Sequence, residues 1–204
     1  MSYTAQDIVT MAQRLLIDID DDAYEPDMLS YFNEWQRRFA TETHCCLDEQ
    51  QVAVSSNLVS FATIAALITG ADELLHVFRV RYDSGSQYSF FPKAKITDLK
   101  NLPASTVTAP TRFWLFGKKL IFDLHPSATI SFNATISASY TPDDLTDLSE
   151  ETLIPAQWAQ AGVKYLEYCA RIADRDAGLA NGAFAEYEAM RFAAATFYKG
   201  QMEL

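Results

Sequence analysis

Three aspartates stand close to the spacing at which an acidic loop can bind calcium. Asp18, Asp20 and Asp22 occupy the first, third and fifth places of such a loop. The template then requires glycine at the sixth place and a bidentate glutamate at the twelfth, where this chain has Ala23 and Leu29. The segment is therefore predicted to be an acidic connection between two helices and not a calcium site.

A second group of metal-ligating types is His44, Cys45 and Cys46. Adjacent ligands cannot close a tetrahedral zinc site alone, because such sites pair spaced ligands. His76 and His125 lie in predicted β-segments and could complete a site only if folding brought them there. The pattern favours a helix end with buried thiols, and no metal or other cofactor is expected.

Residues for covalent or acid–base catalysis are no better organised. The sequence has no G-x-S-x-G elbow. Gly117 and the two lysines after it lack the flanking residues of a phosphate loop, so they predict a hairpin turn. The carboxylate pairs at 143–144 and 150–151 are interpreted as loop charges. We therefore expect a protein that is not an enzyme.

The overall composition limits the partners that the chain can bind. It has 204 residues and a formal net charge of −11, without a basic run, which argues against a module that reads DNA sequence. An acidic wall would still let DNA slide past without being held. Apolar runs are far shorter than the roughly 20 residues that span a bilayer, and three cysteines make no disulfide framework. A protein without a secretion signal is therefore expected.

The N-terminal region is predicted to form two helices. The first begins at the cap residue Thr4, with Asp7 in its first turn. Its apolar stripe comprises Ile8, Met11, Ala12, Leu15, Leu16 and Ile19. The second begins near Pro26, and its stripe comprises Met28, Leu29, Phe32, Trp35 and Phe39.

A β-rich region follows from about Gln51. Strands at 74–82 and 87–91 flank a DSGS turn, and strands at 113–116 and 120–124 flank Gly117-Lys118, so two hairpins are predicted. Residues 130–140 alternate apolar side chains with Ser, Thr and Asn. That uncharged polar face suits a neighbouring subunit's strand or a lumen as well as open water.

The C-terminal region predicts another helix pair. One helix starts at Pro155 and closes at the stretch Gly178–Gly182, and the last is capped by Gly200. The predicted class is α+β: a four-helix bundle from the N- and C-terminal helix pairs with an antiparallel β-hairpin or sheet insert. The predicted domains are residues 1–50, 51–148 and 149–204, the first and last packing as one bundle.

Aromatic residues make up 13% of the chain and extend beyond single core stripes. Aromatic surface in excess of a core is typical of protein contacts, although a core accounts for most such residues. The candidate subunit or partner contacts are Trp114, Phe116, Tyr140, Trp158, Tyr165, Tyr168, Tyr187, Phe192 and Tyr198.

Three stretches resemble the head-to-tail adaptor (connector) proteins of short-tailed bacteriophages. They are the aromatic hairpin PTRFWLFGKKLIFDLHPSA, the helix pair LIPAQWAQAGVKYLEYCARIADRDAGLANGAFAEYEAMR with its Pro-x-x-Trp entry, and LLIDIDDDAYEPDMLSYFNEWQRR with its acidic break. The likeness covers the order of elements along most of the chain. It departs at FATIAALITGADELL, residues 61–75, which is richer in helix formers than a plain strand insert.

The resemblance implies a ring, usually a dodecamer, between the portal and the tail nozzle of the virion. Helices would form the ring body, and the β-part would reach toward the tail. The implied partners are further copies of the chain, the portal protein, and tail nozzle or tail fibre proteins, with no membrane. DNA would pass through the channel without specific binding, and assembly into the virion neck would occur in the host cytoplasm.

One interpretation from a different class stays open at this stage. A tail-associated hydrolase or carbohydrate-binding module would need a cleft in the β-part, lined by Trp114, Tyr88 and nearby carboxylates such as Asp123. Loss of activity on replacing such a carboxylate in a monomeric protein would favour it.

Overall fold

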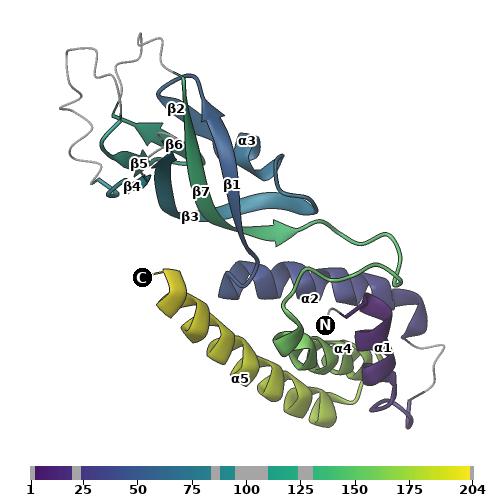
Figure 1. Ribbon diagram of the computed structural model, residues 1–204. Helices are drawn as coiled ribbons and strands as arrows, with labels where there is room; N and C mark the ends of the chain where they lie inside the picture. Colours follow the sequence, from purple (N-terminus) through teal and green to yellow (C-terminus); the bar gives the residue numbers. More distant parts are fainter. Residues whose placement is uncertain (1–2, 20–23, 84–87, 95–109, 124–130, 203–204) are drawn as a thin grey trace. The chain divides into compact units, whose positions relative to one another are not determined.

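The computed structural model describes residues 3–19, 24–83, 88–94, 110–123 and 131–202 (Figure 1). The chain forms two compact units: a helical unit of Met1–Cys46 with Thr141–Leu204, and a β unit of Leu47–Tyr140. The described residues contain five α-helices and two antiparallel sheets, which confirms the α+β class. The boundaries of independently folding domains stay a prediction.

The first helix of the helical unit, α1 (Ala5–Gln13), begins as its sequence predicts. Thr4 is the N-cap and forms a capping box with Asp7: each side chain accepts the other residue's backbone N–H. The helix ends at Gln13, before the last part of the predicted stripe. Leu15 and Leu16 instead donate i→i−3 hydrogen bonds of 2.8 and 3.0 Å, so the chain tightens into a turn while Leu16 remains buried.

Helix α2 (Met28–Thr43) follows a single 3-10 turn, Glu25–Asp27, and carries the centre of the helical core. Trp35 is fully buried and packs edge-on to Phe32, with ring centroids 5.2 Å apart. Its ring lies directly against Gly162 of α4 (Ala159–Ala173), where a Cβ atom would come within 2.9 Å of the indole. Only glycine allows this approach of α4 to α2.

The last helix, α5 (Ala177–Met202), corrects two predicted boundaries. The stretch Gly178–Gly182 was expected to separate two helices, but it lies inside α5. The chain instead turns after α4 at Arg175, whose φ is 64°, and Asp176 then accepts the N–H of Leu179 at 3.2 Å. Gly200 is likewise helical and not a cap. At the other end, a 3-10 turn, Ala156–Trp158, precedes α4.

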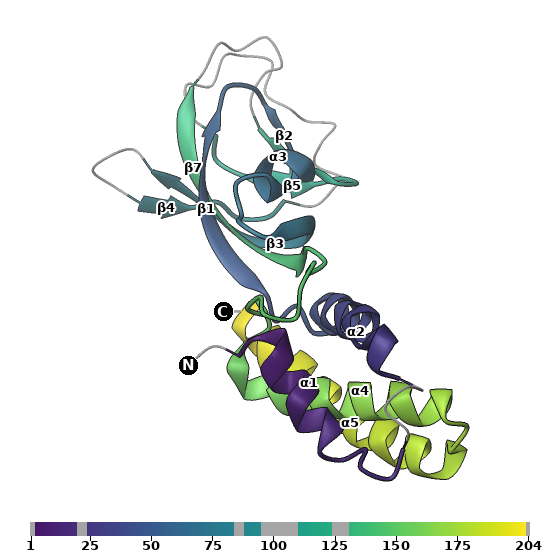
Figure 2. The same ribbon diagram turned by 90° about the vertical axis from the view of Figure 1, so that its right-hand side faces the viewer.

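Within the helical unit, α4 contacts each of the other three helices. Helix α5 packs along α4 and α2, whereas α1 packs on α4 and, to a smaller extent, on α2. Among the described residues α1 and α5 share no extensive contact, and they lie on opposite sides of α4 (Figure 1). In Figure 2, α1 is turned toward the viewer. The unit therefore has an α1 flank and an α5 flank.

The β unit contains seven described strands and one short helix, α3. The sheets run in the orders β1-β7-β3-β4 and β2-β6-β5. The elements are β1 (Leu47–Val54), β2 (Leu58–Ser60), α3 (Phe61–Ala65), β3 (Ala71–Asp83), β4 (Tyr88–Phe90), β5 (Phe113–Leu115), β6 (Lys119–Phe122) and β7 (Phe132–Pro142).

Both predicted hairpins are confirmed by strand pairing. β3 pairs with β4 through Tyr82 opposite Ser89, and β5 pairs with β6 through Trp114 opposite Ile121. Two boundaries differ from expectation. The β-region begins at Leu47 and not near Gln51, and the helix formers of residues 61–75 yield the short helix α3, capped by Ser60.

The alternation along β7 predicted one buried and one solvent-exposed face, but in the structure both faces are buried, apart from Asn133. On the apolar face, Phe132 packs edge-on to Phe122 at 5.2 Å and contacts Tyr82 at 5.6 Å, which joins the two sheets through aromatic rings. On the polar face, Ser137 donates to Glu49 at 3.0 Å, and Glu49 pairs with Arg81 at 3.3 Å. Ser137 is buried, so this polar face is not open to water as predicted.

Some sequence predictions lie outside the described residues. They concern Asp20, Asp22, the DSGS turn, most of the irregular segment before Pro110, and His125. Within the described part of the chain, no helix is both long and apolar enough to cross a membrane.

Candidate assembly surfaces of the helical unit

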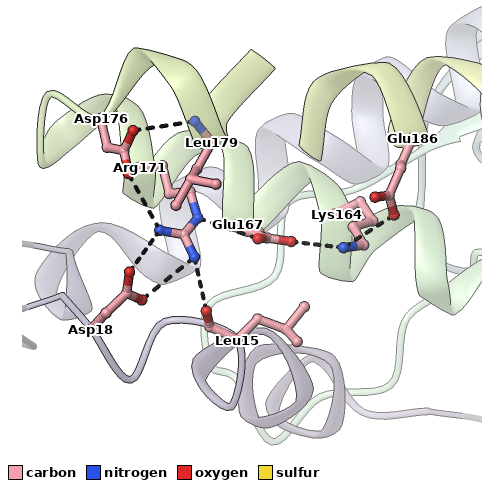
Figure 3. A network of polar contacts seen from close by, with 8 residues as sticks. All are labelled: Leu15, Asp18, Lys164, Glu167, Arg171, Asp176, Leu179 and Glu186. Atoms are coloured by element: carbon pink, nitrogen blue, oxygen red, sulfur yellow. Dashed lines mark hydrogen bonds and ion pairs between the residues drawn. The ribbon is translucent and has the colours of Figure 1, made fainter. Parts of the chain in front are cut away.

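The most connected side chain of the helical unit is the guanidinium of Arg171, near the end of α4 (Figure 3). Arg171 is only 5% exposed. It pairs with Glu167 one turn earlier at 3.2 Å and with Asp18 after α1 at 3.2 Å, and it donates to the carbonyl of Leu15 at 3.0 Å. Asp176, before α5, lies 3.8 Å away. One buried cation thus holds three segments together.

The burial of this cation requires that its charge be balanced. Glu167 supplies a buried carboxylate, and its second oxygen accepts from Lys164 at 2.9 Å. Lys164 in turn pairs with Glu186 of α5 at 3.1 Å. A buried arginine with paired carboxylates and a backbone acceptor avoids the large penalty of an unpaired buried charge. The network fixes the turn after α1 and the start of α5 against α4.

A second charge network joins α2 to α5. Arg191 bonds Glu188 at 2.6 Å on its own helix and Glu42 of α2 at 3.1 Å. Arg38 pairs with Glu42 at 3.1 Å and lies 4.0 Å from Glu188. These four side chains are partly exposed, so they contribute orientation more than stability. Beside them, a surface hollow of about 290 Å³ is lined by Glu34, Arg37, Arg38, Thr41 and Glu42.

Beneath this network lies a cluster of aromatic rings. Tyr165 packs edge-on to Tyr187 at 5.1 Å, and Tyr168 packs against Phe184 in a tilted arrangement at 4.8 Å. The Arg38 guanidinium lies 5.7–6.0 Å from three of these rings, a cation–π distance. Burial raises the pKa of the Tyr187 phenol. Burial, and then the hydrogen bond that it donates to Glu34 at 2.8 Å, raise the pKa of the Tyr165 phenol.

These buried groups predict an alkaline limit to stability. Burial also raises the pKa of the Cys169 thiol to about 12. Below the pKa values of the unfolded chain, about 9 for a thiol and 10 for a phenol, the stabilising effect is fully present. Above them the unfolded chain ionises first, so the free energy of unfolding falls as pH rises. Denaturant titrations from pH 7 to 11 should show this fall, and Tyr165→Phe should make it shallower. An unchanged slope in that variant would contradict the assignment.

The nine predicted contact residues divide by burial. Two lie at the surface: Phe116 at the tip of the β5–β6 hairpin is 57% exposed, and Phe192 on α5 is 70% exposed. Trp158 and Tyr168 are half-buried. The fully or nearly buried ones are Trp114, Tyr140, Tyr165, Tyr187 and Tyr198. A role in subunit or partner contact stays a prediction for all nine, and the geometry favours it for Phe116 and Phe192.

The structure brings some of these residues together inside the helical unit. Trp158 donates its indole N–H to the Tyr198 hydroxyl at 3.2 Å, which ties the turn before α4 to the end of α5. Tyr165, Tyr168 and Tyr187 share the aromatic cluster. Trp114, Phe116 and Tyr140 belong to the β unit, where Arg112 stacks over Trp114 at 5.4 Å. Most of the aromatic excess therefore fills cores.

Other exposed apolar side chains were absent from the predicted set. Ile17, in the turn after α1, is 88% exposed, and Leu179 and Phe197 on α5 are about half exposed. A signal for α5 was present in the sequence, because its apolar residues surround the helix on all sides and do not form one stripe. A helix of that kind is normally buried all round. Ile17 gave no such signal, since it falls between two residues of a buried stripe.

The residues considered above for catalysis or metal binding are buried or take part in local structural contacts, where the structure describes them. Asp123 is buried, and its carboxylate accepts the backbone N–H groups of Thr111 and Arg112 and the Thr111 hydroxyl, so it fastens a loop. Trp114 is fully buried and not part of an open cleft, and the side chain of Tyr88 is outside the described set. Cys45 and Cys46 are buried thiols, as predicted. Among described side chains, no three His, Cys, Asp or Glu residues form a potential metal cluster.

The carboxylates of the acidic loop before α4 also form local structural hydrogen bonds. Asp144 accepts two hydrogen bonds from Arg37, at 2.8 and 2.9 Å. Glu150 accepts the N–H groups of Thr146 and Asp147, at 2.8 and 2.9 Å. Glu150 also accepts a hydrogen bond from the Thr146 hydroxyl. These hydrogen bonds lower the pKa of Glu150, and the one from the Thr146 hydroxyl has the largest effect. Both carboxylate pairs thus lie in a loop, as predicted.

Comparison with known proteins agrees with a structural assignment. No curated protein sequence matches the chain. A family model described as SU10 adaptor protein matches residues 3–201, which is nearly the whole chain and includes both units. Because the match runs through the helical unit, the β unit and the helical unit again, the chain belongs to the SU10 adaptor protein family, a family of structural adaptors of the bacteriophage virion.

Proposed function

We propose that this protein is a head-to-tail adaptor whose copies form a ring that joins the portal to the tail nozzle. The observation that carries this proposal is the family match over residues 3–201. In the proposed ring, the four helices of the helical unit act as one bundle that forms the ring body. The β unit, with its exposed hairpin tip at Phe116, extends toward tail proteins. The ring is proposed to be a dodecamer in the virion neck, assembled in the host cytoplasm.

The proposed channel function follows from charge. The net charge of −11 and the exposed carboxylates of residues 143–151 make the protein a poor binder of phosphate backbones. DNA leaving the head would therefore pass the ring without being held, which is the property that an ejection channel needs. This function requires no cofactor and no catalytic residue.

The proposal is tested by assembly. Purified portal rings are incubated with the purified protein, separated by size and imaged by electron microscopy. We expect an additional ring of density on one end of the portal, and no such density with portal alone. In parallel, particles made without this protein should contain packaged DNA but lack tails. Tailed, infectious particles without it would contradict the proposal.

A hydrolase or carbohydrate-binding role has no comparable support. Its proposed cleft relied on Trp114 and Asp123, and both side chains are buried and engaged in local contacts.

A further inference from the structure

The outer face of α5 has no charge over several turns. It consists of Ala185, Ala189, Phe192, Ala193 and Thr196, all exposed. The acidic and basic side chains of this part of the helix point sideways instead. Glu186 pairs with Lys164 of α4, and Glu188 and Arg191 meet the charges of α2. This placement leaves a surface of small residues with one large apolar side chain, Phe192.

The opposite flank of the helical unit carries a second, mainly uncharged surface, at whose edge Arg14 is exposed. Gln6, Thr10 and Gln13 recur on the outward side of α1, and Gln6 donates to Thr10 at 3.3 Å. Ile17 follows in line and is the most exposed large apolar residue described. Asp7 is turned back to Thr4 in the capping box. The face of α1 thus ends in an isoleucine that projects into solvent.

Among the exposed large apolar residues described in the helical unit, Ile172 lies on α4 and Leu153 in the loop before it, and the other five lie on these two flanks. Leu15 and Ile17 lie on the α1 flank, and Leu179, Phe192 and Phe197 lie on α5. The Arg171 network holds both flanks to the same helix: it bonds Leu15 and Asp18 on one side, and Asp176 next to Leu179 on the other (Figure 3). The two surfaces are therefore fixed relative to each other within one unit.

We propose that the outer face of α5 docks against the α1 flank of a second copy of this chain, which rests on the proposed ring function. Charge favours this occupant. With a net charge of −11, two copies repel each other wherever exposed carboxylates meet. The α5 face has no carboxylate, and on the α1 flank Asp7 and Asp18 are hydrogen-bonded while Arg14 adds an exposed positive charge, so the two faces approach with little of that penalty. Geometry agrees, because the faces differ and lie on opposite sides of α4. A contact between unlike surfaces is heterologous and propagates around a ring, whereas a self-complementary patch stops at a dimer.

Cross-linking tests the pairing directly. Gln13→Cys and Ala189→Cys are combined in one chain, assembled on portal rings and treated with a short bismaleimide. We expect a ladder of dimers, trimers and higher species on denaturing gels. Each single variant should show only the wild-type background, and a mixture of the two should stop at dimers. Dimers from Ala189→Cys alone would mean a two-fold contact and overturn the pairing. A cross-link to the portal instead would also overturn it.

Charge placed on the two faces provides an independent readout. Phe192→Glu and Ile17→Glu should each lower the fraction of chain in rings by at least about tenfold, as expected for loss of an interface hot spot. Their unfolding midpoints should match wild type, because both side chains are exposed. Phe116→Glu, an exposed phenylalanine of the β unit, is the matched control and should still form rings.

The outcomes separate the pairing from the adaptor function. If rings form on the portal but the double-cysteine ladder is absent, the pairing is wrong and the adaptor function stands. If both charge variants form rings like wild type, the pairing is also wrong. If the wild-type chain forms no ring on the portal, the adaptor function fails and the pairing fails with it.

Discussion

Arg171→Ala should lower the free energy of unfolding by about 3 kcal/mol, because it leaves the buried carboxylate of Glu167 without its main partner. The same substitution removes the donor to the Leu15 carbonyl and the partner of Asp18. Lys164 remains on Glu167 and keeps the loss from being larger. Urea or guanidinium unfolding of the isolated chain, followed by circular dichroism, measures the change.

A surface arginine provides the control for that measurement. Arg37 also forms an ion pair, with Asp144 at 2.8 Å, but both side chains are about half exposed. Arg37→Ala should therefore cost no more than about 1 kcal/mol. Equal effects of the two substitutions would show that burial of the Arg171 network does not decide its contribution. Arg171→Lys should recover little, since an ammonium cannot bond several segments in the fork geometry of a guanidinium.

Gly162→Ala should destabilise the protein by about 1–3 kcal/mol, although alanine is the better helix former. The added Cβ would lie 2.9 Å from Cη2 and Cζ2 of Trp35 and 3.0 Å from Cζ3. Trp35 is fully buried between Phe32 and Phe39, so its ring cannot move aside freely. The axes of α2 and α4 must separate, and thermal unfolding should report a lower midpoint.

Another helical glycine gives the opposite expectation. Gly182 lies within α5, and a Cβ there meets nothing within 4 Å. Gly182→Ala should stabilise the chain by about 0.5–1 kcal/mol through helix propensity alone. The cost of Gly162→Ala should also shrink in a Trp35→Phe background, because phenylalanine lacks the indole atoms that clash. If the two substitutions do not couple in this cycle, the contact with Trp35 is not the cause.

The sequence was most informative where pattern and packing agree. Thr4 with Asp7, the stripe around Trp35, and the two hairpins each combine a local signal with one buried face, and the structure contains all of them. The stretch Gly178–Gly182 misled because glycine opposes a helix by only about 1 kcal/mol per residue, less than packing returns. One side of α5 is buried through Ala180, Ala183 and Tyr187, and this packing keeps the chain helical across the glycines.

The candidate surfaces were harder to predict. The sequence alone does not distinguish an aromatic residue of a core from one at an interface. Tyr187 and Phe192 could therefore be assigned to core and surface only once their burial was known. The Arg171 network joins residues far apart in the chain, and no spacing rule links Asp18 to Arg171. Just after the end of α1, the Leu15 carbonyl accepts a hydrogen bond from Arg171, a tertiary contact that no local pattern predicts.

The division of the helical unit between the two ends of the chain affects the order of events during synthesis. Helices α1 and α2 leave the ribosome first, but α4, against which Trp35 packs, follows only after more than a hundred further residues. The whole β unit is translated in between and can fold while Trp35 and its neighbours still lack a partner. Newly made chains thus pass through a stage with exposed apolar helices, in which chaperone binding or premature self-association competes with completion of the fold.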